Sequence, residues 1–158
     1  MNISKQLAQD VLKHLFQNEA ITGIGDASGV LGSATAGSLY LRGCTDAVAA
    51  NIETLGTECA YTGYTAGGVA IARTTGKWTV SWNDTDNKAE LVNVEEELMG
   101  ERTDAGAAET LKYIELWKNN SSSAIADRLA WAELTTPLSV TQGVQPRFAA
   151  GKIKFKLF

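Results

Sequence analysis

The first part of the chain has the spacing of apolar residues that is typical of an amphipathic helix. Its apolar side chains recur at helical intervals: Leu7, Val11, Leu12 and Leu15. Ser4 stands directly before this run, where its hydroxyl can accept a hydrogen bond from a backbone N–H of the first turn. The pattern therefore predicts a helix over residues 4–17.

Glycine-rich sequence follows the predicted helix. Glycines interrupt any regular pattern after residue 22, which predicts a loop: Gly23, Gly25, Gly29 and Gly32. The next short run, 38–42, suits a strand. We therefore expect a helical segment over 1–22, a glycine-rich loop over 23–37 and a β-rich domain over 38–158, all within one folding unit.

Apolar and polar residues alternate in two later segments, as they do along β-strands. Trp78, Val80 and Trp82 alternate with polar residues, which places both tryptophans on one face of a strand. At the C-terminus, Ile153, Phe155 and Leu157 alternate with lysines. A row of outward lysines discourages edge-to-edge pairing, so this last strand is expected at an exposed sheet edge.

One segment, 105–118, has two interpretations. Its Ala, Glu, Leu and Lys content favours a helix, whereas Tyr113, Ile114, Leu116 and Trp117 also suit a strand that is buried on both faces. Elsewhere, short strands separated by Gly, Asn and Pro indicate a β-sandwich or jelly roll. The expected fold class is mainly β, a jelly-roll-like antiparallel β-sandwich with a short N-terminal α-helix.

Composition narrows the classes of function. The 158 residues are 20% charged, and the net charge is −4 with scattered Lys and Arg, which argues against a nucleic-acid or anionic-membrane surface. No apolar stretch reaches the length of a membrane span. Asp10, Lys13 and His14 interrupt the apolar core that a signal peptide needs, so we expect no export. Cys44 and Cys59 fit no metal-binding or redox spacing, and we expect two unpaired, partly buried thiols.

The chain offers no pattern of catalytic residues, so we expect a non-enzymatic protein with no cofactor and no metal. His14 is the only histidine and lies within the predicted amphipathic helix, without an orienting partner nearby. Residues 25–29 do not match a serine nucleophile motif. Residues 84–87 begin like a calcium loop, but the glycine and the distal glutamate are missing, so a hairpin turn explains them better.

Several residues are candidates for contact with a partner. The four tryptophans fall at strand positions, where core packing is the first expectation; aromatic side chains are also enriched in interfaces, which makes Trp82 a candidate. Glu95, Glu96 and Glu97 form either a solvated stretch or a surface for a basic partner. The helix packs on its own domain or docks on a partner through its apolar side: Leu7, Val11, Leu15 and Phe16.

The order of segments along nearly the whole chain resembles that of a family of small virion proteins of tailed bacteriophages. Members of this family are described as tail-fibre-like, and some are similar to capsid cement or decoration proteins. The segments that carry the resemblance are VLKHLFQNEAIT (11–22), SLYL (38–41), YTGY (61–64), VAIAR (69–73), WTV (78–80), PLSV (137–140), GVQPRF (143–148) and the alternating strand at 152–157.

The resemblance implies a strand at about 109–118 and a structural role in the virion. It implies a cement or decoration protein that binds the major capsid protein on the capsid exterior, associates with itself on a symmetry axis and assembles in the host cytoplasm. One alternative is a component of the tail or fibre base. Another, from a different class, is a carbohydrate-binding β-sandwich in which Trp78 and Trp82 form a stacking platform.

Overall fold

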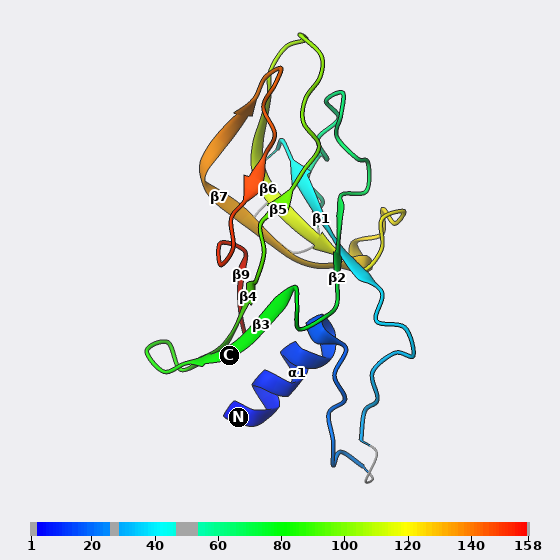
Figure 1. The fold of residues 1–158 in the computed structure, drawn as a ribbon, viewed down its shortest axis with the longest axis vertical. Helices are drawn as coiled ribbons and strands as arrows, with labels where there is room; N and C mark the ends of the chain where they lie inside the picture. The colour runs from blue at the N-terminus through cyan, green and yellow to red at the C-terminus, as the bar shows by residue number, and fades with distance from the viewer. Residues whose placement is uncertain (1–2, 26–28, 47–53, 158) are drawn as a thin grey trace. The chain divides into compact units, whose positions relative to one another are not determined.

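The computed structural model describes residues 3–25, 29–46 and 54–157, and it has a mainly β fold (Figure 1). The helix is α1 (Lys5–Gln17), and one turn of 3₁₀ helix, Ile125–Asp127, precedes the longest strand. The strands are β1 (Ser38–Cys44), β2 (Val69–Ala72), β3 (Trp78–Asn83), β4 (Lys88–Asn93), β5 (Glu97–Leu98), β6 (Glu109–Trp117), β7 (Arg128–Val140), β8 (Arg147–Phe148) and β9 (Lys154–Leu157). The predicted class, mainly β with antiparallel sheets and one N-terminal helix, is confirmed. The jelly-roll arrangement stays a prediction.

The chain divides into two compact units that are built from separate stretches of sequence. The helical unit contains Met1–Gly37, Ala72–Glu96 and Phe148–Phe158, and it holds α1 and a sheet of order β3-β4-β9. The sheet unit contains Ser38–Ile71 and Glu97–Arg147, and it holds a sheet of order β2-β1-β6-β7. A third small sheet pairs β5 with β8.

These units cut across the segments 1–22, 23–37 and 38–158 that were predicted from the sequence. The C-terminal strand β9 returns to pair with β4, with Phe155 opposite Leu91. That pairing joins the end of the chain to the helical unit. Local sequence patterns do not encode it, because they report only the period within one strand.

The N-terminal helix forms as predicted, although its buried side is shifted by one position. Ser4 Oγ accepts a hydrogen bond from Leu7 N at 3.1 Å and caps the helix, which ends at Asn18 with φ 59°. The buried side chains are Ala8, Leu12 and Phe16. The Phe16 ring lies 5.2 Å from that of Trp78 on β3 and 5.5 Å from that of Phe155 on β9. These aromatic contacts fix the helix on its sheet.

A hairpin turn joins β3 to β4, in agreement with the sequence analysis. Asn83 Oδ1 accepts hydrogen bonds from Thr85 N at 3.0 Å and Asp86 N at 3.1 Å. Asn87 has a positive φ of 54°, a conformation that asparagine tolerates better than most residues. The residues that resemble the start of a calcium loop therefore shape a turn.

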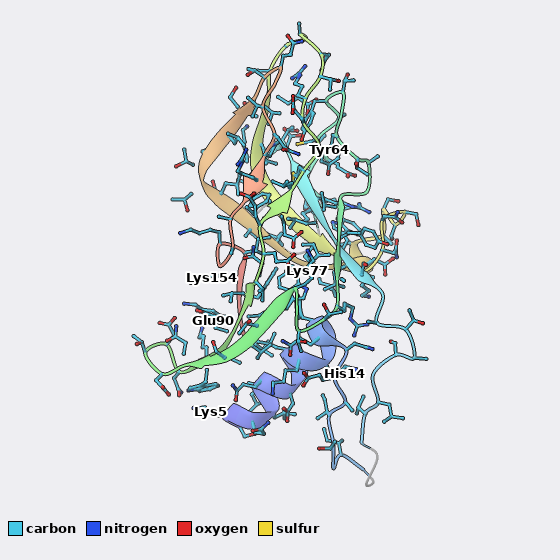
Figure 2. The ribbon with its side chains drawn as sticks, in the orientation of Figure 1. Lys5, His14, Tyr64, Lys77, Glu90 and Lys154 are labelled. Atoms are coloured by element: carbon cyan, nitrogen blue, oxygen red, sulfur yellow. The ribbon has the colours of Figure 1, made fainter. Side chains whose placement is uncertain are left out.

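Strand β9 is the edge that the lysines predicted. It pairs with β4 on one side and is the last strand in the order β3-β4-β9. Lys154 and Lys156 are exposed and lie 3.9 and 3.7 Å from Glu90 on β4, and Lys156 also contacts Asp86 (Figure 2 labels Lys154 and Glu90). The charged side chains of these two lysines therefore lie along the edge and oppose the approach of another strand.

The ambiguous segment forms strand β6, as the family resemblance implied. Five consecutive residues from Tyr113 to Trp117 are buried. Such a run has no alternation because both faces of the strand are covered. The helix that residue propensity favoured is therefore wrong, since tertiary burial outweighs propensity here.

Two buried arginines organise the sheet unit. The Arg42 guanidinium donates to the carbonyls of Asn119, Asn120 and Ser122, and it stacks 4.0 Å from the Trp117 ring. It thereby fixes the loop that follows β6. The second arginine, Arg102, is held by Asp104 through two hydrogen bonds of 2.9 and 3.0 Å.

A buried ion pair anchors the start of β7 on β6. Arg128 Nη1 lies 2.8 Å from Glu115 Oε1, and the side chains are only 3% and 2% exposed. Glu115 also accepts hydrogen bonds from Trp117 Nε1 at 2.9 Å and from Gly56 N at 3.1 Å. A buried carboxylate is tolerated here because its oxygens are satisfied on several sides.

Candidate interaction surfaces

Residues 18–25 and 29–37 form the two sides of an arm, and these sides run next to each other (Figure 1). Ile21 and Val30 exchange two backbone hydrogen bonds, each of 2.9 Å. At the base, the Asn18 side chain donates to Ser33 O at 2.8 Å and accepts from Ser33 N at 2.7 Å. The arm, which the sequence predicted only as a loop, is therefore a defined structure.

Arg73 ties the returning end of the arm to the end of α1. Its guanidinium donates to His14 O at 2.7 Å and Leu15 O at 2.6 Å, which are carbonyls of the last helical turn. It also donates to Ala36 O at 3.1 Å. One cation thus satisfies helix-end carbonyls that would otherwise lack partners and holds the returning side of the arm.

Two glycines allow the sides of the arm to approach each other. A Cβ atom at Gly29 would lie 2.0 Å from Ile21 O, and one at Gly32 would lie 2.2 Å from Asn18 O. No side chain fits at either distance. Gly29 also has a positive φ of 65°. Glycine is therefore required at both positions because the backbone strands of the arm approach too closely for a side chain. It does not serve to make the arm flexible.

The arm exposes apolar side chains to an unusual degree. Ile24, Val30 and Leu31 are 47%, 42% and 67% exposed. Between Ala20 and Leu41, the sequence has a single charged residue, Asp26. Asp26, Ala27 and Ser28 lie outside the described residues. An apolar and preformed surface with so little charge has the composition of an interface core, which is depleted of charged residues.

The structure separates the four helix residues that were predicted as an interface. Leu15 is exposed, and Leu7 and Val11 are partly exposed. Phe16 is instead buried between Trp78 and Phe155, so its place is in the core of the helical unit and it is removed from the candidate interface. The sequence analysis chose the wrong edge of the stripe because Ala8, a small residue, lies on the buried side.

The two tryptophans of β3 do not form a shared platform. Trp78 is fully buried, whereas Trp82 is partly exposed, and the Lys5 ammonium lies 5.3 Å from its ring centroid. Stacking on a sugar needs open aromatic faces. Trp82 alone keeps its place as a candidate contact residue.

The three consecutive glutamates have different surroundings, so they do not form one acidic surface. Glu95 and Glu96 are exposed, and Glu95 Oε2 accepts a hydrogen bond from Lys77 at 2.6 Å (Lys77 is labelled in Figure 2). Glu97 is buried at the start of β5. Interaction with a basic partner therefore remains a prediction for Glu95 and Glu96 only.

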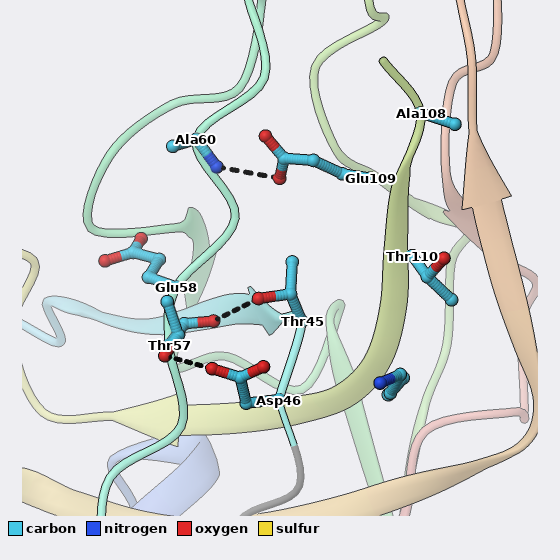
Figure 3. A pocket seen from close by; sticks show the side chains of 9 residues that line it. Thr45, Asp46, Thr57, Glu58, Ala60, Ala108, Glu109 and Thr110 are labelled. Atoms are coloured by element: carbon cyan, nitrogen blue, oxygen red, sulfur yellow. Dashed lines mark hydrogen bonds between the residues drawn. The ribbon is translucent and has the colours of Figure 1, made fainter.

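A polar groove of about 400 Å³ lies in the sheet unit (Figure 3). Its lining residues are Thr45, Asp46, Thr57, Glu58, Ala60, Ala108, Glu109, Thr110 and Lys112. The carboxylates are engaged within the fold, since Thr57 Oγ1 donates to Asp46 Oδ2 at 2.5 Å and Ala60 N donates to Glu109 Oε2 at 3.0 Å. Within the described ranges, no three His, Cys, Asp or Glu side chains are placed to hold a metal ion.

Both cysteines are buried free thiols. Burial, reinforced by the charge of Glu109, raises the pKa of Cys59 to about 12, and burial beside Glu115 raises the pKa of Cys44 further. Cys44 lies opposite Glu58 across an antiparallel bridge, one position away from Cys59. Neighbouring positions point to opposite faces, so the two thiols do not face each other. The predicted unpaired state holds, and both thiols are poor nucleophiles at neutral pH.

His14 has a structural contact at the end of α1. Its Nδ1 lies 2.8 Å from Glu19 O, so this nitrogen carries the proton that is donated to the carbonyl. The ring thereby helps to hold the chain where it leaves the helix.

Among the described residues, no helix combines the length and the apolar character that crossing a bilayer requires.

Comparisons with known proteins give no relative whose binding surface could be compared with these. No protein-family model, no curated protein and no solved structure matches this chain.

Proposed function

We propose that the chain is a structural virion protein of a tailed bacteriophage, namely a cement protein that binds the major capsid protein lattice on the capsid exterior. The order of segments from VLKHLFQNEAIT to the final alternating strand supports the virion family. The observation that carries the binding role is the arm, which presents Ile24, Val30 and Leu31 on a preformed scaffold.

The arm is suited to bind a lattice of subunits. Burial of one Leu, Ile or Val side chain contributes about 1.5–3 kcal/mol, so three such anchors supply substantial affinity. Because the arm is tied down by Arg73 and Asn18, little conformational freedom is lost when it docks. A protein that binds the assembled lattice in preference to separate subunits stabilises the assembly by mass action, and no chemical step is needed.

Copy number per virion tests this proposal directly. Quantitative mass spectrometry of purified particles would measure the chain against the major capsid protein. A ratio near a simple fraction supports a cement protein. A handful of copies per particle would instead support the tail or fibre base, and absence from the virion would refute both structural roles.

The arm itself is tested by Leu31→Asp, which places a charge on its most exposed apolar residue. Loss of a buried leucine and burial of a carboxylate are expected to weaken binding to capsids at least about a hundredfold. Co-sedimentation of purified protein with particles that lack it measures this change.

The control is Val94→Asp, because Val94 is also an exposed apolar residue, 41% exposed, but lies outside the arm. This variant is expected to bind like the unmodified protein. Equal binding by all three proteins would show that the arm is not the contact.

A further inference from the structure

Strand β7 is long, lies at the edge of its sheet and is exposed along nearly its whole length. It has 13 residues, and apart from Val140 and the buried side chain of Arg128 these are partly or fully exposed. It is the last strand in the order β2-β1-β6-β7. Leu129 and Leu138 are each 37% exposed, and Trp131 is only partly covered by its contact with Tyr113. An open sheet edge presents backbone N–H and C=O groups to which another strand can bind.

Charge does not cover this edge. The strand has two charged residues. Arg128 is engaged in the buried ion pair with Glu115 and does not face the edge with its charge, and the other is Glu133. From Leu134 to Pro146 no charged residue follows. Natural edge strands commonly carry lysines that prevent pairing, and β7 has none.

Irregularities limit the part of β7 that can pair. Ala130 to Glu133 are in continuous register with Leu116 to Tyr113. The register shifts before this stretch, at Leu129, and after it, where residues 134–137 form a bulge that contains Pro137. Bulges disrupt further pairing. The open edge is therefore a short, regular stretch, 130–133, with defined ends.

We propose that β7 pairs antiparallel with β7 of a second copy of this chain, about a two-fold axis at Ala132, so that the two copies of Ala132 lie directly opposite each other on the same face of the sheet. A strand that pairs with its own copy needs no second surface, and a central axis places Glu133 beside a neutral residue of the partner rather than beside the partner's Glu133. The short stretch between the two irregularities restricts the register and stops the pairing from extending along the whole strand. The contact is small, so the dimer is weak and depends on concentration. This inference does not require the virion role.

Self-association is measured by sedimentation velocity of the purified full chain from micromolar to millimolar concentration. A shift from monomer to dimer is expected. Ala132→Lys brings two like charges together at the axis and is expected to weaken association at least about tenfold. The control Ser139→Lys adds the same charge to an exposed site of the same strand beyond the bulge, and it should leave association unchanged.

A crosslinking experiment keeps the proposal testable if a lysine variant folds poorly. Both native thiols are buried, so the new thiol of Ala132→Cys is the accessible one. Mild oxidation should yield a covalent dimer from Ala132→Cys and much less from Ser139→Cys. A monomer at every concentration, or equal crosslinking of the two variants, would overturn the proposal and leave this edge to a different protein.

Discussion

The edge strands β9 and β7 both leave backbone N–H and C=O groups open to another strand, and they differ in what limits pairing there. On β9, Lys154 and Lys156 face Glu90 and Asp86, so a strand that approached this edge would meet charged, solvated side chains. On β7, the regular stretch 130–133 carries a single charged residue, Glu133, and register shifts on either side restrict the edge to this short stretch. Charged side chains oppose pairing along the whole edge, whereas bulges only limit the length of strand that can pair. An edge that is limited but not closed is suited to a specific contact.

The largest expected effect concerns the anchor of β7. Glu115→Ala removes the carboxylate that faces Arg128 and leaves a buried guanidinium without its counter-charge. We expect a loss of about 3–5 kcal/mol in the free energy of unfolding. Urea denaturation measures it.

A control for this prediction removes both charges. Glu115→Gln combined with Arg128→Met should recover a substantial part of the loss, because no buried charge is then unpaired. A loss below about 1 kcal/mol for Glu115→Ala would show that β7 does not depend on this pair.

A smaller effect on stability is expected when the charged edge is opened. Lys154→Thr together with Lys156→Thr removes ion pairs with Glu90, which contribute little to stability because the exposed lysines are screened by solvent. The same change removes the lysines that guard β9, so we expect new self-association in sedimentation experiments. Exchange of Lys152 for Thr is the control, since this lysine lies outside β9. No new association in the double variant would mean that the lysines are not what closes this edge.

The smallest effect is a dependence of stability on pH at the β9 edge. Hydrogen bonding and attraction from Lys156 lower the pKa of Asp86 below its usual value of 3.8. A carboxylate with a lowered pKa stabilises the fold above its unfolded pKa, and that stabilisation is lost as the pH falls through the folded pKa. Urea denaturation between pH 7 and pH 2 should show a shallower loss for Asp86→Asn. An identical pH profile would exclude a contribution from this pair.

The sequence predicts those elements whose pattern reflects one-sided burial. The alternation at 153–157 located an edge strand, and the stripe around Leu12 located α1. Strand β6 gave no such pattern because both of its faces are buried. Its residue types therefore left helix and strand open, and the family resemblance decided in favour of the strand. Strand β7 has the opposite property: almost nothing in it is buried, and its full extent follows from pairing with β6.

The candidate surfaces were harder to predict than the fold. The sequence analysis selected Phe16 and Glu97, which are buried, and it treated the arm as a flexible loop. A usable indication was present, namely three large apolar residues among glycines in a stretch with one charge. The hydrogen bonds of Asn18 and Arg73 that give the arm its shape join distant positions, and no local pattern reports them.

The clamp formed by Arg73 has a consequence for how the chain can change over evolutionary time. Because one guanidinium fixes the end of α1 and the returning side of the arm, the base of the arm is held by contacts that do not involve the sequence between Ile21 and Gly29. Lengthening a loop with fixed ends costs only about 0.6 kcal/mol for each doubling of its length. Insertions between Ile21 and Gly29 are therefore expected to leave the base of the arm intact, so that the same scaffold could carry a foreign peptide for display.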